Sequence, residues 1–462
     1  MIADIHYLSL AEAAGFIRDG KLSPVELTRV CLDRIESLNP RIHAFITVLS
    51  DLAIKAATRA EKEIHEGRYR GPLHGIPIAH KDILWTKGIR TTAHSRLLET
   101  WIPHESATVV ELLENAGAVC LGKTALHEFA YGSPGPDEVF PAARNPWNLD
   151  YAPGSSSSGS GAAVAAGLCM AATGTDTGGS VRHPACVCGV VGMKATYGLV
   201  STYGVIPLAP SLDHVGLLTR TVMDNALVLQ AMAGYDPRDP TSIAFDVPNF
   251  GRLIGKEIKR MRIGVPRRFI EAYPHSSEVI DAFDRSLAVL RELGALVEEI
   301  DPPGLNDCID AVNTIIGFEA YRYHRASLQH HSDLLGQAFK GRFDRRYGED
   351  DYGRALVIRE QLKTVYRELF NSGIDVVVSP GKEVPADLMT DLLAAPAKRP
   401  VSNRIYSLTG MPALTMPMAL SAQGLPMGIQ IAANVFREDI IYQVASAFEA
   451  TTGFRQLHPS LA

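Results

Sequence analysis

The sequence predicts a single large α/β domain, residues 1–462, with a central β-sheet covered by helices on both faces. Short apolar runs such as residues 76–79 and 374–378 have the length and composition of strands that are buried on both sides. Helical segments alternate with these runs. With 46% hydrophobic and 21% charged residues, the chain can bury a large core. We divide it into a helical lead-in, residues 1–65, and a main α/β body, residues 66–462.

Two helices of the lead-in have clear start signals. Ser9 and Ser23 each stand three residues before a glutamate, which is the pattern of a capping box. Pro24 occupies the first helical position, which proline favours. We expect the second helix to end at residues 39–40 (Asn-Pro). A third, alanine-rich helix is expected over about residues 51–66.

The body is predicted to alternate helices and strands from residue 71 onward. Residues 109–115 are predicted as a helix and residues 118–121 as a buried strand. Residues 162–167 are all small and are predicted as a tightly packed buried helix. A further strand is expected at residues 262–266. It lies inside the segment 234–303, whose Asp- and Pro-rich connections we interpret as a boundary between halves of one fold.

One motif suggests a different class of protein. Residues 117–124 match the nucleotide-binding pattern of a glycine, four residues and Gly-Lys-Thr. A phosphate-binding loop must follow a strand and precede a helix. Here the four intervening residues are themselves the predicted strand, and the predicted helix comes before it. The sequence therefore disfavours a P-loop nucleotide-binding protein, and we assign Lys123 a structural role.

Composition argues against several other classes of function. The net charge is −6 and the basic residues are scattered, unlike a nucleic-acid-binding surface. No run of about 18 apolar residues occurs and the N-terminus lacks signal-peptide features, so we expect a cytoplasmic protein without membrane contact. Six cysteines are sparse for this length and fit a reducing compartment. Cys186 and Cys188 lack the partners of a zinc site, and we predict no metal and no other cofactor.

Two glycine- and serine-rich loops, residues 153–161 and 176–182, follow an isolated lysine, Lys81, in an apolar setting. A serine hydroxyl is a poor nucleophile unless a nearby base takes its proton, and a buried lysine can be that base. Gly178 and Gly179 allow a tight turn that points N–H groups into one concavity. Such loops are also common as linkers or plain turns. The first loop leads directly into a predicted core helix, however, which a flexible linker would not do.

The order of these motifs resembles the amidase signature family. Lys81 stands in a Gly-Ile-Pro-x-x-x-Lys-Asp segment, the serine-rich loop follows, and residues 176–182 read Asp-Thr-Gly-Gly-Ser-x-Arg. Further matching motifs occur at residues 192–198, 410–413 and 424–430, so the resemblance covers most of the chain. It implies the amidase signature fold, with a central mixed β-sheet, and an enzyme that hydrolyses amide bonds.

By position, the resemblance implies a Ser-Ser-Lys triad. Ser180 would be the nucleophile, Ser156 the bridging serine, usually in a cis peptide linkage, and Lys81 the base. The family loop usually reads Gly-Gly-Ser-Ser-Gly-Gly-Ser, and two of its glycines are serines here. Ser157, beside the bridging position, therefore remains a second possibility for that role. The reaction would pass through an acyl-enzyme and would accelerate toward alkaline pH as the lysine loses its proton.

Other residues are expected to support this triad. Asp176 and Arg182 bracket the nucleophile loop and are assigned as partners that hold it, with a simple surface ion pair as the alternative. His80 is expected to point away from Lys81, because neighbouring residues of a strand face opposite sides. The oxyanion hole is expected to consist of backbone N–H groups that precede or belong to the nucleophile: Thr177, Gly178, Gly179 and Ser180.

The substrate is predicted to be a small-molecule carboxylic amide, either aryl or alkyl, with a carbamate as a variant. This preference rests on apolar side chains that could line a pocket: Phe129, Tyr131, Tyr406 and Met411. The alternative within the family is the glutamine-hydrolysing component of a tRNA-dependent amidotransferase, which works with partner subunits. There, an acidic residue binds the glutamine ammonium, whereas Pro400 falls near its position in this chain and residues 392–436 hold no Asp or Glu. The oligomeric state is open and includes a homodimer.

Overall fold

An eleven-stranded mixed sheet runs through the whole molecule. The computed structural model describes residues 4–394 and 404–461, and the strands lie in the order β1-β3-β2-β4-β6-β5-β10-β11-β9-β7-β8. Strand β2 is parallel to β3 and β4, whereas most pairs around the centre are antiparallel. The strands are β1 (Phe45–Val48), β2 (Pro77–Lys81), β3 (Val119–Thr124), β4 (Ala171–Thr175), β5 (Val191–Lys194), β6 (Val215–Thr219), β7 (Arg262–Val265), β8 (Leu296–Glu299), β9 (Val376–Pro380), β10 (Ala413–Leu420) and β11 (Pro426–Ala432).

Helices cover both faces of this sheet. Leu217 and Leu218 are neighbours in β6, yet they belong to separate buried clusters, since successive side chains of a strand point to opposite faces. Helices α2, α5 and α6 contribute to one cluster, and α1, α7 and α15 to the other. The single α/β domain with a covered mixed sheet is therefore confirmed.

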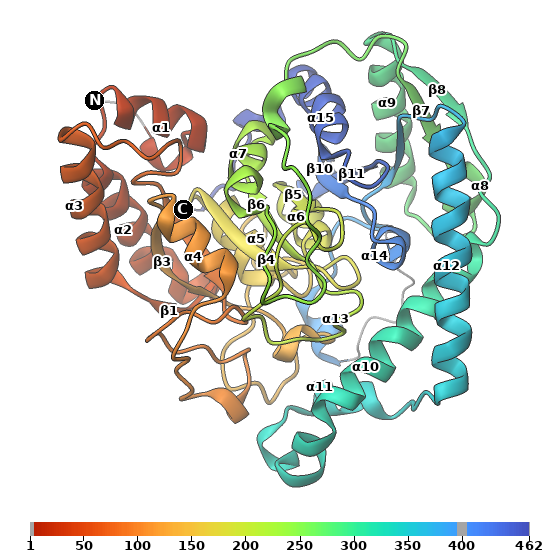
Figure 1. The fold of residues 1–462 in the computed structure, drawn as a ribbon, viewed down its shortest axis with the longest axis horizontal. Coiled ribbons are helices and arrows are strands. Elements are labelled where there is room, and N and C mark those ends of the chain that lie inside the picture. Colours follow the sequence, from red (N-terminus) through yellow and green to blue (C-terminus); the bar gives the residue numbers. More distant parts are fainter. Residues whose placement is uncertain (1–3, 395–403, 462) are drawn as a thin grey trace.

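Two long helices, α10 and α12, pack against each other at the edge of the molecule far from the N-terminal helices (Figure 1). The α-helices are α1 (Leu10–Arg18), α2 (Pro24–Ile42), α3 (Ser50–His65), α4 (Thr108–Asn115), α5 (Ser158–Ala165), α6 (Arg182–Cys188), α7 (Val222–Met232), α8 (Arg267–Glu271), α9 (Ser277–Glu292), α10 (Cys308–His330), α11 (Gln337–Lys340), α12 (Glu349–Asn371), α13 (Met389–Ala394), α14 (Ile405–Thr409) and α15 (Glu438–Thr452). In the described residues no helix has both the length and the apolar character needed to cross a membrane.

The lead-in differs from its prediction in three details. Ser9 forms the full capping box of α1, but the Ser23 hydroxyl donates to Glu61 while it caps α2. The expected end of α2 at Pro40 is wrong, because α2 continues to Ile42. A proline in the last turn removes a single intrahelical hydrogen bond, and the helix tolerates that loss. The lead-in also supplies strand β1, which pairs with β3 and was not predicted.

The small residues predicted as a buried helix form α5, which starts inside the serine-rich loop and is entirely buried. The helix lies very close to neighbouring backbone. A Cβ atom on Gly159 would be 2.4 Å from the carbonyl oxygen of Ala44, and one on Gly161 would be 2.9 Å from Cβ of Pro184. Only glycine fits at these two positions. The N-terminus of α5 is therefore fixed in place, together with the serines that precede it.

The nucleotide-binding pattern does not form a phosphate-binding loop. Gly122, Lys123 and Thr124 all lie in β3, and their backbone takes part in the sheet. The Lys123 ammonium is buried and donates to the carbonyl of Leu84 at 2.7 Å and the hydroxyl of Thr91 at 2.8 Å. Lys123 thus joins β3 to the segment after β2, as its assigned structural role requires.

Candidate active site

Lys81 is the last residue of β2 and is fully buried. Its ammonium nitrogen donates to three hydroxyl oxygens: Ser156 at 2.9 Å, Ser157 at 3.0 Å and Thr175 at 2.7 Å. Thr175 ends β4, which is parallel to β2, so both residues emerge at the same edge of the sheet. Burial lowers the pKa of Lys81 from 10.5 to about 7, although Asp176 and Asp213 oppose this shift. A lysine in this setting is substantially neutral at physiological pH.

The serine-rich loop brings two hydroxyls to this lysine. The peptide bond between Ser155 and Ser156 is cis. Ser157 is tied to the end of β4: its hydroxyl accepts from the N–H of Thr175 and donates to the carbonyl of that residue, both at 3.3 Å. The Ser156 hydroxyl, by contrast, has Lys81 as its one hydrogen-bond partner in the described chain. Ser156 is therefore the less constrained of the two hydroxyls.

Ser180 lies in the turn between β4 and α6 and is half-buried. Its carbonyl accepts a hydrogen bond from the N–H of Ser157 at 3.1 Å, so the two loops predicted from the sequence are joined directly. The Ser180 hydroxyl donates to no group among residues 4–394 and 404–461. The structure thus brings together the backbones of the two loops and leaves this hydroxyl unengaged.

Asp176 and Arg182 hold the nucleophile loop from inside. Both side chains are completely buried, and Arg182 donates from Nε and Nη2 to the carboxylate, at 3.0 Å each. Arg182 also donates to Gln430 at 2.7 Å and to Ser407 at 2.8 Å. Burial alone would raise the pKa of Asp176, but the Arg182 guanidinium holds it well below its usual value. The alternative of a surface ion pair is therefore wrong.

The predicted oxyanion hole needs a correction at Gly179. Its N–H donates to the Asp176 carboxylate at 2.7 Å, so this donor is already engaged and points into the loop. The N–H groups of Thr177, Gly178 and Ser180 have no hydrogen-bond acceptor in the described part of the chain. These three N–H groups remain as candidates for an oxyanion hole.

Three of the four predicted pocket residues are packed in the interior. Phe129 lies between His324 and Phe339, with ring centroids at 4.5 and 5.3 Å. Tyr406 is 2% exposed and Met411 3%. Aromatic and methionine side chains fill cores as readily as pockets, which explains the error. Tyr131 differs, because it is half-buried beside a guanidinium, 5.9 Å from the centre of its ring.

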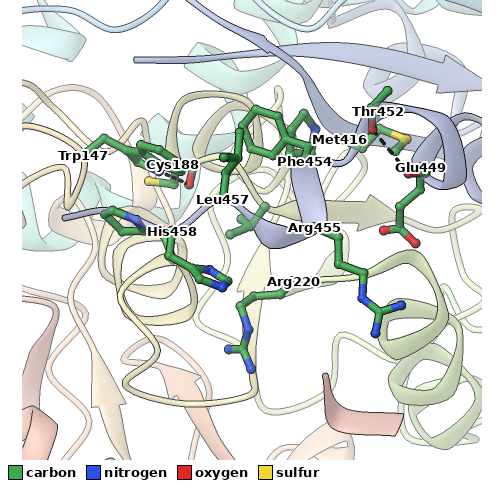
Figure 2. A pocket seen from close by; sticks show the side chains of 15 residues that line it. Trp147, Cys188, Arg220, Met416, Glu449, Thr452, Phe454, Arg455, Leu457 and His458 are labelled. Carbon is green, nitrogen blue, oxygen red and sulfur yellow. Dashed lines mark hydrogen bonds between the residues drawn. The ribbon is translucent and has the colours of Figure 1, made fainter. Parts of the chain in front are cut away.

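His80 faces away from the serines, as predicted: its Nδ1 is 3.3 Å from the hydroxyl of Thr173. A cavity elsewhere in the molecule is also separate from the site. Figure 2 shows that it is lined by residues near the ends of α6 and α15 and by the C-terminal segment, including Arg220 and Glu449. Apart from Cys188, which is buried and free, none of the residues singled out from the sequence lines this cavity.

Sequence reasoning missed several groups of this site. Thr175, a direct partner of Lys81, immediately precedes the quoted motif 176–182 and ends a strand, so its position was a usable signal. Ser407 and Gln430 reach Arg182 from α14 and β11, more than 220 residues away in the chain. No local pattern indicates such contacts. Pro400, used in the argument about glutamine, lies outside the described residues.

We predict that Asp176→Asn destabilises the fold by about 3–5 kcal/mol, because it leaves the buried Arg182 charge without its partner. The amide would also direct N–H groups at the N–H of Gly179 or at the guanidinium. Urea unfolding of the two proteins measures the difference. Asp351→Asn, which removes an exposed partner of Arg354, is the control and should hardly change stability. A loss below about 1 kcal/mol for Asp176→Asn would mean that this ion pair does not hold the loop.

A sheet covered on both faces, with a buried lysine and two serine-bearing loops at one edge, defines a hydrolytic α/β enzyme. The chain belongs to the amidase family, whose family model matches residues 26–441. It is 36% identical over 488 residues to a glutamyl-tRNA(Gln) amidotransferase component of Carboxydothermus hydrogenoformans, covering 99% of this chain and 100% of that protein. The reaction class is therefore cleavage of a C–N amide bond.

Solved structures agree with this assignment. The peptide amidase of Stenotrophomonas maltophilia superposes with a TM-score of 0.83 at 32% identity, covering 96% of each chain. A chain of a vestigial protein complex related to an s-triazine catabolic enzyme superposes with a TM-score of 0.90 at 28% identity, covering 96% of this chain and 99% of that one. The family thus includes proteins of quite different substrates on one fold, so substrate must be argued from the site.

Proposed function

We propose that the chain is a serine amidase that hydrolyses a carboxylic amide through a relay of Lys81, Ser156 and Ser180. The observation that carries this proposal is the buried Lys81 nitrogen, 2.9 Å from the Ser156 hydroxyl, with a pKa lowered to about 7 by burial. A base with a pKa near the working pH is well suited to proton transfer. Ser157, held by the backbone of Thr175, positions Lys81 in this proposal.

The proposed reaction has two steps. Neutral Lys81 takes the proton of Ser156, Ser156 takes the proton of Ser180, and the Ser180 oxygen attacks the amide carbonyl. The free N–H groups of the nucleophile loop stabilise the oxyanion of the tetrahedral intermediate. As the C–N bond breaks, Ser156 returns a proton to the leaving amine and an acyl-enzyme remains. Water then attacks the acyl-enzyme, loses its proton to the same relay, and the carboxylate leaves.

A second candidate is the glutamine-hydrolysing component of a tRNA-dependent amidotransferase. The observation in its favour is the 34–38% identity over nearly the whole chain to proteins named as components of glutamyl-tRNA(Gln) amidotransferase. That function requires partner subunits. Against it stands the absence of Asp and Glu from residues 392–436, where the resemblance implies an acidic residue for the glutamine ammonium.

A substrate panel separates these functions. Benzamide, an acyl anilide, an aryl carbamate and L-glutamine are each offered to the purified chain, and release of acid and amine is measured. The chain is also treated with phenylmethylsulfonyl fluoride, and the labelled peptide is identified by mass spectrometry. We expect turnover of at least one amide and a sulfonyl adduct on Ser180. Turnover of glutamine alone would favour the amidotransferase function. An adduct confined to a different serine would refute the proposed nucleophile.

A further inference from the structure

An arginine lies against the proposed oxyanion loop without taking part in the relay. Arg404 directly precedes α14, the short helix that packs between α10 and α12 (Figure 1). A Cβ atom on Gly178 would lie 3.8 Å from Nε of Arg404 and 3.4 Å from Cδ1 of Ile316. The guanidinium is therefore beside the backbone that would face the reacting carbonyl.

One edge of this guanidinium is unused. Nη1 of Arg404 donates to the side-chain oxygen of Asn313 on α10, which fixes the orientation of the group. Nε is buried and has no hydrogen-bond acceptor among the described residues. A buried donor without an acceptor is costly and rare in folded proteins. Such a donor at the mouth of a reaction site suggests an acceptor that arrives with the substrate.

The surroundings leave this corner of the site positive. Arg342 is a second guanidinium near Arg404, and its Nε is also buried without an acceptor in the described chain. Burial lowers the pKa of Arg404, Tyr131 and Glu383 act in the opposite direction, and Arg342 adds to the lowering. Glu383 is thus the acidic side chain that acts on Arg404, and it has another interaction of its own. An anion entering between the two guanidinium groups would relieve their repulsion.

We propose that Arg404 binds a carboxylate of the substrate, so that the enzyme acts on amides that carry a carboxylate a few bonds from the amide carbonyl. This inference rests on the proposed function, because it places the amide at Ser180. Arginine suits the role, since its planar fork can donate two parallel hydrogen bonds to one carboxylate. The apolar side chains of Val312 and Ile316 lie beside the same loop and would contact the short carbon chain that joins the two groups.

Matched pairs of amides test this proposal. Succinamate and butyramide have the same chain length, but only succinamate ends in a carboxylate. We expect the wild-type enzyme to show a kcat/KM for succinamate at least tenfold higher than for butyramide. In Arg404→Gln this ratio should fall at least tenfold, mainly through KM, and Arg404→Lys should recover part of it. Arg268→Gln removes an exposed positive charge and is the control that should keep the wild-type ratio.

The outcomes separate this inference from the proposed function. If the wild-type enzyme hydrolyses both amides equally well and the activity requires Ser180, the carboxylate subsite is wrong and the amidase function stands. If no amide is hydrolysed by a Ser180-dependent reaction, both proposals fall. The wild-type ratio decides the matter even if Arg404→Gln does not fold. A further pair, glutaramate and L-glutamine, differs in the α-ammonium group, so equal rates would show that a carboxylate suffices and a preference for glutamine would show that it does not.

Discussion

Replacing Ser180 by alanine is expected to lower kcat for any amide substrate by roughly four to six orders of magnitude, as loss of a nucleophile does in other serine hydrolases. Without the oxygen no acyl-enzyme forms, and only the residual stabilisation from the loop N–H groups remains. The fold should be unaffected. The Ser180 hydroxyl is half-buried and donates to no group in the described chain, so alanine leaves no buried polar atom without a partner.

This result is measured with the best substrate of the panel, together with thermal unfolding of both proteins. Ser446→Ala, at a half-buried serine on α15, is the matched control and should keep full activity. Activity of Ser180→Ala above about one tenth of wild type would contradict the nucleophile assignment, because a true nucleophile cannot be removed at so small a loss. Ser156 and Ser157 would then have to be tested as the attacking group.

Much of the fold was predictable because the signals are local. Strands β2, β3, β7 and β9 each coincide with a predicted apolar run, since a strand buried on both faces must be apolar along its whole length. Strand β1 could not be recognised in this way: its four residues are only partly buried. It forms because Asn39 bonds to the backbone of Phe45 in both directions and because β3 offers a free edge. The order of the eleven strands depends on long-range pairing, which no local pattern encodes.

The candidate site shows the same division. Lys81 and the two loops were found because a base and hydroxyls with these neighbours have few other uses, and the structure places Lys81 on Ser156. The engagement of Gly179 by Asp176 was missed, since spacing does not tell which N–H groups of a tight turn point inward. The aromatic pocket was wrong for Phe129 for a related reason. An apolar side chain near a motif can serve the core or the substrate, and only burial distinguishes the two.

Replacing Lys81 by methionine is expected to lower kcat/KM by roughly two to four orders of magnitude, the usual contribution of a general base. The wild-type activity should rise between about pH 5 and pH 9, with its midpoint near the Lys81 pKa of about 7, because only the neutral amine can accept the Ser156 proton. The residual activity of Lys81→Met should lack this rise. Rates are compared across that pH range with one substrate.

Stability gives an independent test of the same lysine. The folded-state pKa of Lys81 is lowered from 10.5 to about 7, so between these pH values the unfolded chain binds the proton and the folded protein does not. The wild-type free energy of unfolding therefore gains from Lys81 as pH rises from about 7 toward 10.5. Relative to wild type, Lys81→Met should be most stable at or below pH 7 and should lose this advantage as the pH increases.

Lys123→Met is the matched control, because Lys123 is also fully buried, also bound to hydroxyls and on the neighbouring strand β3. It contacts none of the site serines, so its variant should keep the alkaline rise in activity whatever happens to stability. If Lys123→Met abolishes that rise, or Lys81→Met retains it, the base in the relay is not Lys81. A buried amine alone does not make a base: the position of Lys81 on Ser156 distinguishes it from Lys123.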